Sequence, residues 1–202
     1  MANFTDLTGL GGIALALAML SGLALLRRQV SKRLSSLLAG AIFVALLVPF
    51  GELPPAAYVR GMIGDLSVTT LFILAYVYGH RLLGWPRLEA QQRSGLLLLL
   101  VLAACALYPL ALGADMYDPY RLGYGEPWFL VLLLALALAG VALRMPLVAL
   151  PISLAVLAWT IGWYESGNLW DYLIDPLLAI YAVFGCLSAS CSLCRKRGSE
   201  HG

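Results

Sequence analysis

Hydrophobic residues form long blocks along this chain, and short polar segments separate the blocks. A helix that crosses ~30 Å of hydrocarbon needs about 20 mostly apolar residues. Seven blocks meet this requirement, some of them only just, so tilt or a thin local bilayer is expected. The sequence predicts seven spans, with six or eight as alternatives, at Leu7–Leu26, Leu34–Phe50, Met62–Tyr78, Leu96–Leu112, Trp128–Leu143, Leu147–Trp163 and Leu173–Leu193.

Only Arg144, Met145 and Pro146 separate the fifth block from the sixth. Proline after a basic residue favours a tight hairpin between two helices over one long helix. At the other end of the chain, Met1–Leu7 holds no basic residue, and Arg27 and Arg28 directly follow the first block. The first span is therefore expected to remain as an anchor and not to be cleaved as a signal peptide.

The composition sets the class of protein. Of the 202 residues, 61% are apolar and 12% are charged, whereas soluble domains average about 25% charged residues. A fold of this size exposes too much of its surface to hide so many apolar groups from water. This excludes a soluble enzyme, a nucleic-acid-binding module and a disordered regulator. We expect one integral membrane domain over residues 1–202, an all-α polytopic bundle whose Leu/Ala/Arg-rich composition suggests a bacterial cytoplasmic (inner) membrane.

The basic residues predict the orientation of the bundle. In the seven-span arrangement eleven of the thirteen lie on one side, and only Arg60 and Arg121 lie on the other. Cytoplasmic loops carry an excess of Lys and Arg. The N-terminus is therefore expected outside and the C-terminus in the cytoplasm. The eleven residues are Arg27, Arg28, Lys32, Arg33, Arg81, Arg87, Arg93, Arg144, Arg195, Lys196 and Arg197.

The acidic residues divide in the opposite sense, with nine of eleven on the predicted outer side. One interpretation is helix capping, because Asp118, Glu126 and Asp175 each precede a proline, and acids complement the helix N-terminus. Asn168 followed by Asp171 likewise resembles a capping box. The other interpretation is a binding site among outer acids, aromatic residues and the two outer arginines.

Arg60 and Asp65 are the first candidates for such a site. Asp65 lies at the edge of the third predicted span, and an acid drawn into the membrane indicates function by default. Arg60 has two interpretations: an ion pair with Asp65 or Glu52, or a contact to an anionic lipid headgroup or phosphate. The full set of candidate ligand-binding residues is Arg60, Asp65, Arg121, Glu165, Asp171 and Asp175.

Asp171 and Asp175 are four residues apart and would share one face of a helix that began early enough. Such a carboxylate pair could bind a cation or act as acid and base.

No cofactor, metal or catalytic residue is predicted. His80 and His201 both fall on the predicted cytoplasmic side, so haem ligation and histidine-based zinc or serine chemistry at the outer face have no support. Cys186, Cys191 and Cys194 have a ferredoxin-like spacing. They lie in a hydrophobic helical segment without a fourth nearby cysteine, which favours ordinary membrane cysteines.

Three functions fit these observations. The first is a non-catalytic accessory protein or subunit, with the lipid bilayer and another membrane protein as partners and no nucleic acid. The second is a small cation or solute transporter or channel, whose outer acids concentrate cations. The third is an enzyme acting on lipid headgroups at the outer leaflet through Asp or Glu and Arg. The lack of a catalytic constellation favours the first.

Overall fold

The computed structural model describes residues 4–87, 89–111 and 118–199. These residues form helices joined by short segments, and no β-strand occurs among them; Phe50 and Leu53 make one isolated bridge. The all-α prediction is thereby confirmed. The helices group into two compact units, residues 1–87 with 151–173, and residues 88–150 with 174–202. The expectation of one integral membrane domain over residues 1–202 stays a prediction.

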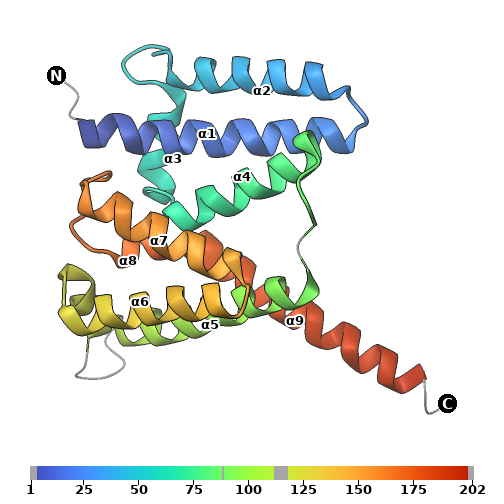
Figure 1. Cartoon of the computed structure of the whole chain (residues 1–202). Coiled ribbons are helices and arrows are strands. Elements are labelled where there is room, and N and C mark those ends of the chain that lie inside the picture. The colour runs from blue at the N-terminus through green and yellow to red at the C-terminus, as the bar shows by residue number, and fades with distance from the viewer. Residues whose placement is uncertain (1–3, 88, 112–117, 200–202) are drawn as a thin grey trace. The chain divides into compact units, whose positions relative to one another are not determined.

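The first unit is built around α1 (Phe4–Arg27). Helix α2 (Lys32–Leu47) returns antiparallel beside it, and α3 (Pro55–Ile63) and α4 (Val68–Leu83) pack on α1 as well (Figure 1). The unit also takes in the later part of α7 (Pro146–Thr160) and the short α8 (Trp170–Leu173).

The second unit contains α5 (Ala90–Ala111), the 3-10 helix η1 (Pro119–Tyr124), α6 (Pro127–Ala142), the start of α7 and α9 (Pro176–Ser199). Helix α5 packs on α9 and on η1.

Helices α6 and α7 form the predicted hairpin. Arg144 adopts a left-handed conformation (φ 54°), and the Met145 N–H donates to the Gly140 carbonyl at 2.7 Å. A side chain at Gly140 would lie 3.1 Å from the backbone nitrogen of Ala149, so the two helices approach closely.

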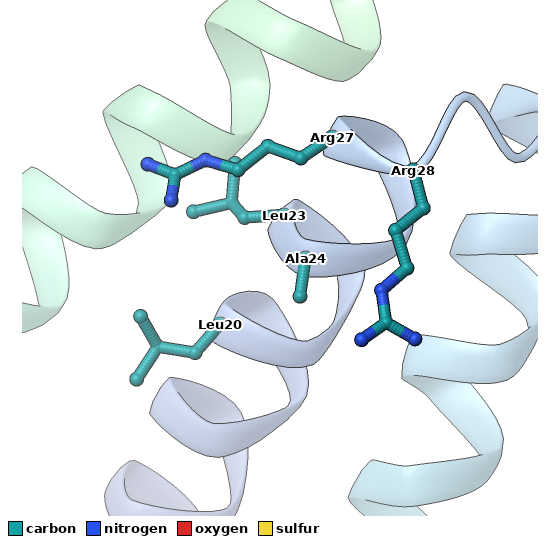
Figure 2. A pocket seen from close by; sticks show the side chains of 5 residues that line it. All are labelled: Leu20, Leu23, Ala24, Arg27 and Arg28. Atoms are coloured by element: carbon teal, nitrogen blue, oxygen red, sulfur yellow. The ribbon is translucent and has the colours of Figure 1, made fainter.

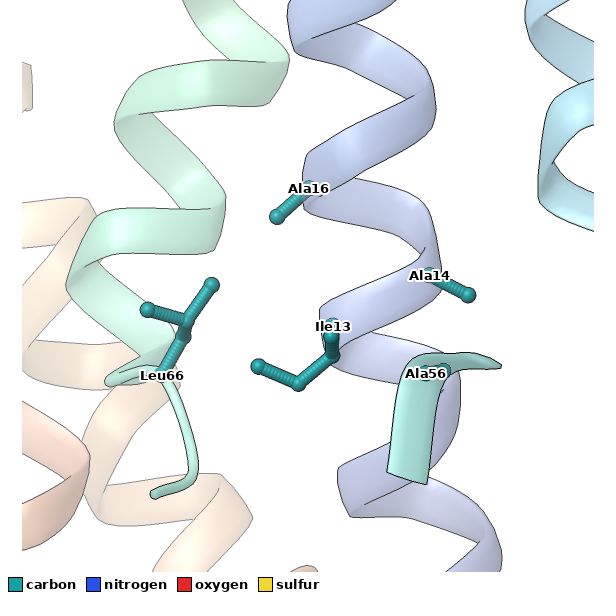
Figure 3. Packing of buried hydrophobic residues seen from close by; sticks show 5 residues of the cluster. All are labelled: Ile13, Ala14, Ala16, Ala56 and Leu66. Atoms are coloured by element: carbon teal, nitrogen blue, oxygen red, sulfur yellow. The ribbon is translucent and has the colours of Figure 1, made fainter. Parts of the chain in front are cut away.

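Ile13 and small residues of α1 form a buried core in the first unit. Ile13, Ala14 and Ala16 are buried with Ala56 of α3 and with Leu66, and Ile13 points toward Leu66 (Figure 3). Such small residues let helices pack closely in a membrane, where no hydrophobic force draws them together.

Gly22 continues this close packing along α1. A side chain there would meet the Tyr78 ring of α4 at 2.6 Å, and the Gly22 carbonyl accepts a hydrogen bond from Ser35 Oγ of α2 at 2.9 Å.

The prediction of one continuous third span, Met62–Tyr78, is wrong. Helix α3 ends at Ile63, and α4 begins only at Val68. Gly64 ends α3 with a φ of 76°, and the Ser67 side chain caps α4 by accepting the Thr70 N–H at 3.1 Å. Both are ordinary helix-terminating features, a positive φ that favours glycine and a serine N-cap. Asp65 therefore lies between two helices and not at the start of one.

Within the described ranges, two helices are long and apolar enough to cross a membrane, over Thr5–Arg27 and Ala90–Leu110. The remaining apolar helices are shorter, at Val68–Leu83, Pro127–Ala142, Pro146–Thr160 and Pro176–Ser188. These lengths give weak support for a membrane protein.

Candidate functional site

Arg60 lies at the centre of a group of charges in the first unit. It stands on the last turn of α3, and Asp65 follows in the gap before α4. Asp6 comes from the first turn of α1, and Glu165 from the segment between α7 and α8. Asp6, Arg60, Asp65 and Glu165, named the Arg60 cluster below, thus join three distant parts of the sequence.

The Arg60 guanidinium forms a fork with Asp65. Its Nε donates to Asp65 Oδ1 at 2.6 Å, and Nη2 donates to Asp65 Oδ2 at 2.9 Å. Paired hydrogen bonds between two charged groups are the strongest polar contacts that side chains make. Nη1 reaches Asp6 Oδ1 at 3.3 Å, and Nη2 also reaches Glu165 Oε2 at 3.3 Å. All three nitrogens of Arg60 therefore face carboxylates.

Gly9 of α1 lies directly against this fork. A Cβ atom at Gly9 would lie 2.4 Å from Asp65 Oδ1, 2.7 Å from Arg60 Nε and 2.9 Å from Arg60 Cζ. Heavy atoms cannot approach so closely, and the two atoms nearest to Gly9 are those of the 2.6 Å hydrogen bond. The missing side chain at Gly9 is thus what allows Arg60 and Asp65 to pair against α1.

The cluster is partly shielded from water. The Arg60 side chain is 17% exposed and that of Asp65 is 22% exposed, against 33% for Asp6 and 54% for Glu165. The hydrogen bond to Asp65 is the main cause that raises the pKa of Arg60, and Asp6 and Glu165 add to it. Arg60 therefore stays charged.

Glu165 has a different balance of neighbours. A hydrogen bond with Asp6 and the negative charge of Asp6 raise the pKa of Glu165, while Arg60 lowers it by less. Two carboxyl groups side by side disfavour double ionisation, because like charges repel. Asp6 therefore makes the ionised form of Glu165 less favourable.

Two tyrosines hold the segment that carries Glu165. Tyr164 Oη donates to the Leu66 carbonyl at 2.8 Å, in the gap between α3 and α4. Tyr172 Oη accepts the Tyr164 N–H at 3.0 Å and lies 3.0 Å from the Ser166 carbonyl. Tyr172 is buried, and this burial raises the pKa of its hydroxyl. The non-helical backbone on both sides of the cluster is thereby hydrogen-bonded by side chains.

Asp171 takes part in this network in a way that differs from the predicted capping box. Asn168 Oδ1 does accept the Trp170 N–H at 2.9 Å, as a cap at the start of α8. The Asn168 N–H, however, donates to Ser166 Oγ at 3.0 Å, and the Ser166 hydroxyl donates to Asp171 Oδ2. The Ser166 hydroxyl thus connects the two residues.

The predicted face shared by Asp171 and Asp175 does not form, since Asp171 lies in α8 and α9 begins only at Pro176. Asp175 is 4% exposed, and its carboxylate accepts the Leu178 N–H at 2.9 Å. Its capping role is confirmed. Asp118 caps η1 through the Tyr120 N–H at 2.9 Å, whereas Glu126 precedes α6 without a side-chain cap.

Arg121, the second outer arginine, is exposed on η1 in the second unit. Among the described residues no carboxylate pairs with it. The structure thus joins Arg60, Asp65 and Glu165 of the six candidates in one cluster. Asp6 and Gly9 were missed as members. Asp6 resembles an ordinary acid in the first turn of a helix, and no local pattern connects residue 6 or 9 to residue 60.

The Arg60 cluster has little capacity left for a ligand. A phosphate could form a bidentate contact with Arg60 only by displacing a carboxylate from it. Within the described part of the chain, no group of three or more His, Cys, Asp or Glu residues is arranged to hold a metal ion.

Comparisons with protein-family models, with curated proteins and with solved structures found no match to this chain.

Proposed function

We propose that the chain is a multi-pass membrane protein of about seven spans that serves as a non-catalytic accessory protein or subunit. In this proposal the Arg60 cluster is a structural clamp at the outer face. The observation that carries it is the engagement of all three Arg60 nitrogens by carboxylates from three segments. An arginine held in this way fixes the positions of the helices, and its guanidinium has no pair of N–H groups free for a bidentate contact to a substrate.

Charge within the first unit supports the proposed orientation. The N-terminal end of α1, the α2–α3 connection and the α3–α4 gap lie at one end of the unit (Figure 1), and they carry Asp6, Glu52 and Asp65. At the opposite end α1 finishes, α2 starts and α4 finishes. The basic residues Arg27, Arg28, Lys32, Arg33, Arg81 and Arg87 belong to that end. Such a division fits an outer acidic end and a cytoplasmic basic end.

Exposed apolar side chains support contact with lipid. On α6, Trp128 is 78% exposed, Leu134 59% and Val141 65%. Such wide apolar exposure along a whole helix is rare on a soluble protein and marks a membrane or protein interface. We place the protein in the bacterial cytoplasmic membrane, with a second membrane protein as its partner.

Three measurements test this proposal. Reporter fusions after residue 31 and after residue 89 are expected in the cytoplasm, and fusions after residues 52 and 115 outside. Release of the protein from membranes by alkaline carbonate would contradict insertion. Purification in a mild detergent, followed by mass measurement of the intact particle, is expected to give an assembly with a second protein. A particle that holds one copy of this chain alone would contradict the accessory role.

A small cation transporter is the second candidate, and the Asp6–Glu165 pair is the observation that favours it. Asp6 raises the pKa of Glu165, and a carboxyl group with a perturbed pKa can serve as a site of proton exchange. In liposomes, a proton flux lost in Glu165→Gln and kept in Asp171→Asn would support transport over the accessory role. An equal flux in protein-free liposomes would reject it.

The third possibility, an enzyme acting on lipid headgroups, requires Arg60 to be free for substrate. The carboxylates that surround Arg60 therefore count against this function.

A further inference from the structure

A pocket at the C-terminal end of α1 combines apolar and cationic walls. It has a volume of about 310 Å³ and is lined by Leu20, Leu23, Ala24, Arg27 and Arg28. Figure 2 shows the Arg27 side chain extending over Leu23 toward α4 and the Arg28 side chain on the side of α1 near α2. The pocket therefore has a floor of aliphatic side chains and two guanidinium groups at its rim.

Helical spacing orders these groups by depth. Leu20, Leu23 and Arg27 are spaced three and four residues apart, which places them on one face of α1. At 1.5 Å per residue, the distance along the helix from Leu20 to Arg27 is roughly 10 Å. If α1 crosses the membrane as proposed, Arg27 lies at headgroup level and Leu20 lies among the acyl chains.

Both arginines lack an acidic partner within the described residues, since the ion pairs there all belong to Arg60. Arg27 in the last turn of α1 complements the helix dipole. The next basic residues have no such explanation, because Lys32 and Arg33 stand in the first turn of α2, where the dipole favours acids. Four cations thus lie within seven residues of sequence, two of them at the pocket, and none pairs with a carboxylate among the described residues.

We infer that this pocket binds one anionic phospholipid of the cytoplasmic leaflet. The lipid phosphate lies between Arg27 and Arg28, and the first part of an acyl chain lies on Leu23 and Leu20. Exposed arginine side chains change rotamer rapidly, so both can converge on one phosphate. Basic clusters next to the cytoplasmic end of a span attract anionic lipids. The pocket volume, at the lower end of ligand sites, suits a headgroup and the beginning of a chain.

The test measures lipid binding to the detergent-purified full chain by mass spectrometry of the intact protein. Phosphatidylglycerol and phosphatidylcholine with the same acyl chains are added separately. We expect tighter binding of phosphatidylglycerol, and a loss of about fivefold in its affinity for each arginine changed in Arg27→Gln and Arg28→Gln. The double variant is expected to lose about thirtyfold.

Arg87→Gln combined with Arg93→Gln is the matched control, because it removes the same charge from two other exposed arginines. An equal loss in this control would show diffuse attraction and overturn the site, as would equal binding of the two lipids. Competition with inorganic phosphate distinguishes a lipid site from a site for free phosphate. If phosphate alone displaces the lipid at similar concentration, the apolar floor does not contribute and a lipid site is excluded.

The inference rests on the proposed membrane location of α1, and carbonate extraction tests that location on its own. A photoreactive phosphatidylglycerol with its label in the acyl chain tests the pocket in the unaltered protein. Labelling at Leu20–Ala24 is expected, and labelling confined to other helices would overturn the proposal even if an arginine variant failed to fold.

Discussion

Replacing Arg60 by glutamine is expected to destabilise the first unit. The change removes both hydrogen bonds of the fork to Asp65, at 2.6 and 2.9 Å, in a site where Arg60 is 17% exposed. A hydrogen bond to a charged group contributes ~1.5–3 kcal/mol. A glutamine amide is shorter and restores one bond at most. The 3.3 Å contact to Asp6 adds about 0–1 kcal/mol, because Asp6 is one-third exposed.

The expected loss is therefore about 2–4 kcal/mol at neutral pH, where three carboxylates also remain together without a cation. For a chain of this size each kcal/mol lowers the melting temperature by ~2–4 °C. Thermal unfolding in detergent, followed by tryptophan fluorescence, should show a fall of roughly 5–15 °C.

Two variants control for charge and for surface change. Arg60→Lys keeps the charge but lacks the planar fork, and it should fall between the wild type and Arg60→Gln. Arg121→Gln removes the other outer arginine, which is exposed and has no acidic partner among the described residues, and it should leave the melting temperature unchanged. If Arg60→Gln melts like Arg121→Gln, the cluster does not act as a clamp.

Three further changes probe the surroundings of the cluster. Gly9→Ala should destabilise the protein, because the added Cβ meets Asp65 and Arg60, although alanine favours helix by ~1 kcal/mol. Gly11→Ala should not destabilise it, because a Cβ at Gly11 has no neighbouring atom within 4 Å. Equal melting temperatures for the two variants would refute the close contact at Gly9. The raised pKa of Glu165 means that its carboxyl group binds a proton more tightly in the folded state than in the unfolded state. The contribution of Glu165 to stability therefore rises as the pH falls from above that raised pKa toward the ordinary value of 4.5. Glu165→Gln should remove this part of a stability profile against pH, and an unchanged profile would show that Asp6 does not raise the pKa of Glu165. Tyr164→Phe should cost about 1–3 kcal/mol by leaving the Leu66 carbonyl without its 2.8 Å donor; Tyr181→Phe, at an exposed tyrosine on α9, should have no effect in the same melting assay.

Local patterns predicted the local parts of this structure. Apolar block length and proline position were sufficient for the hairpin at Arg144–Pro146, and an acid before proline predicted the caps at Asp118 and Asp175. The same approach misplaced the start of the third span. Average hydrophobicity over Met62–Tyr78 hides a backbone turn that depends on one glycine φ and one serine cap.

The Arg60 cluster was only partly accessible from sequence. An ion pair of Arg60 with Asp65 was one predicted interpretation of Arg60, because the two residues are only five positions apart in the sequence. The other was a contact to an anionic headgroup. Glu165 was a candidate, but its contact to Arg60 bridges 105 residues and depends on how Tyr164 anchors its segment. The role of Gly9 depends on a distance between helices, which no pattern along the chain records.

The span of the Arg60 cluster along the chain has a consequence for biosynthesis. Ribosomes add about 5–20 residues per second, so Glu165, 105 residues beyond Arg60, is made roughly 5–20 s later. During that interval α1, α3 and α4 are already synthesised, and Asp6 and Asp65 are the cluster members available to Arg60. The four N-terminal helices can thus assemble before the rest of the chain exists. Glu165 then joins last and ties the late segment to a completed early one.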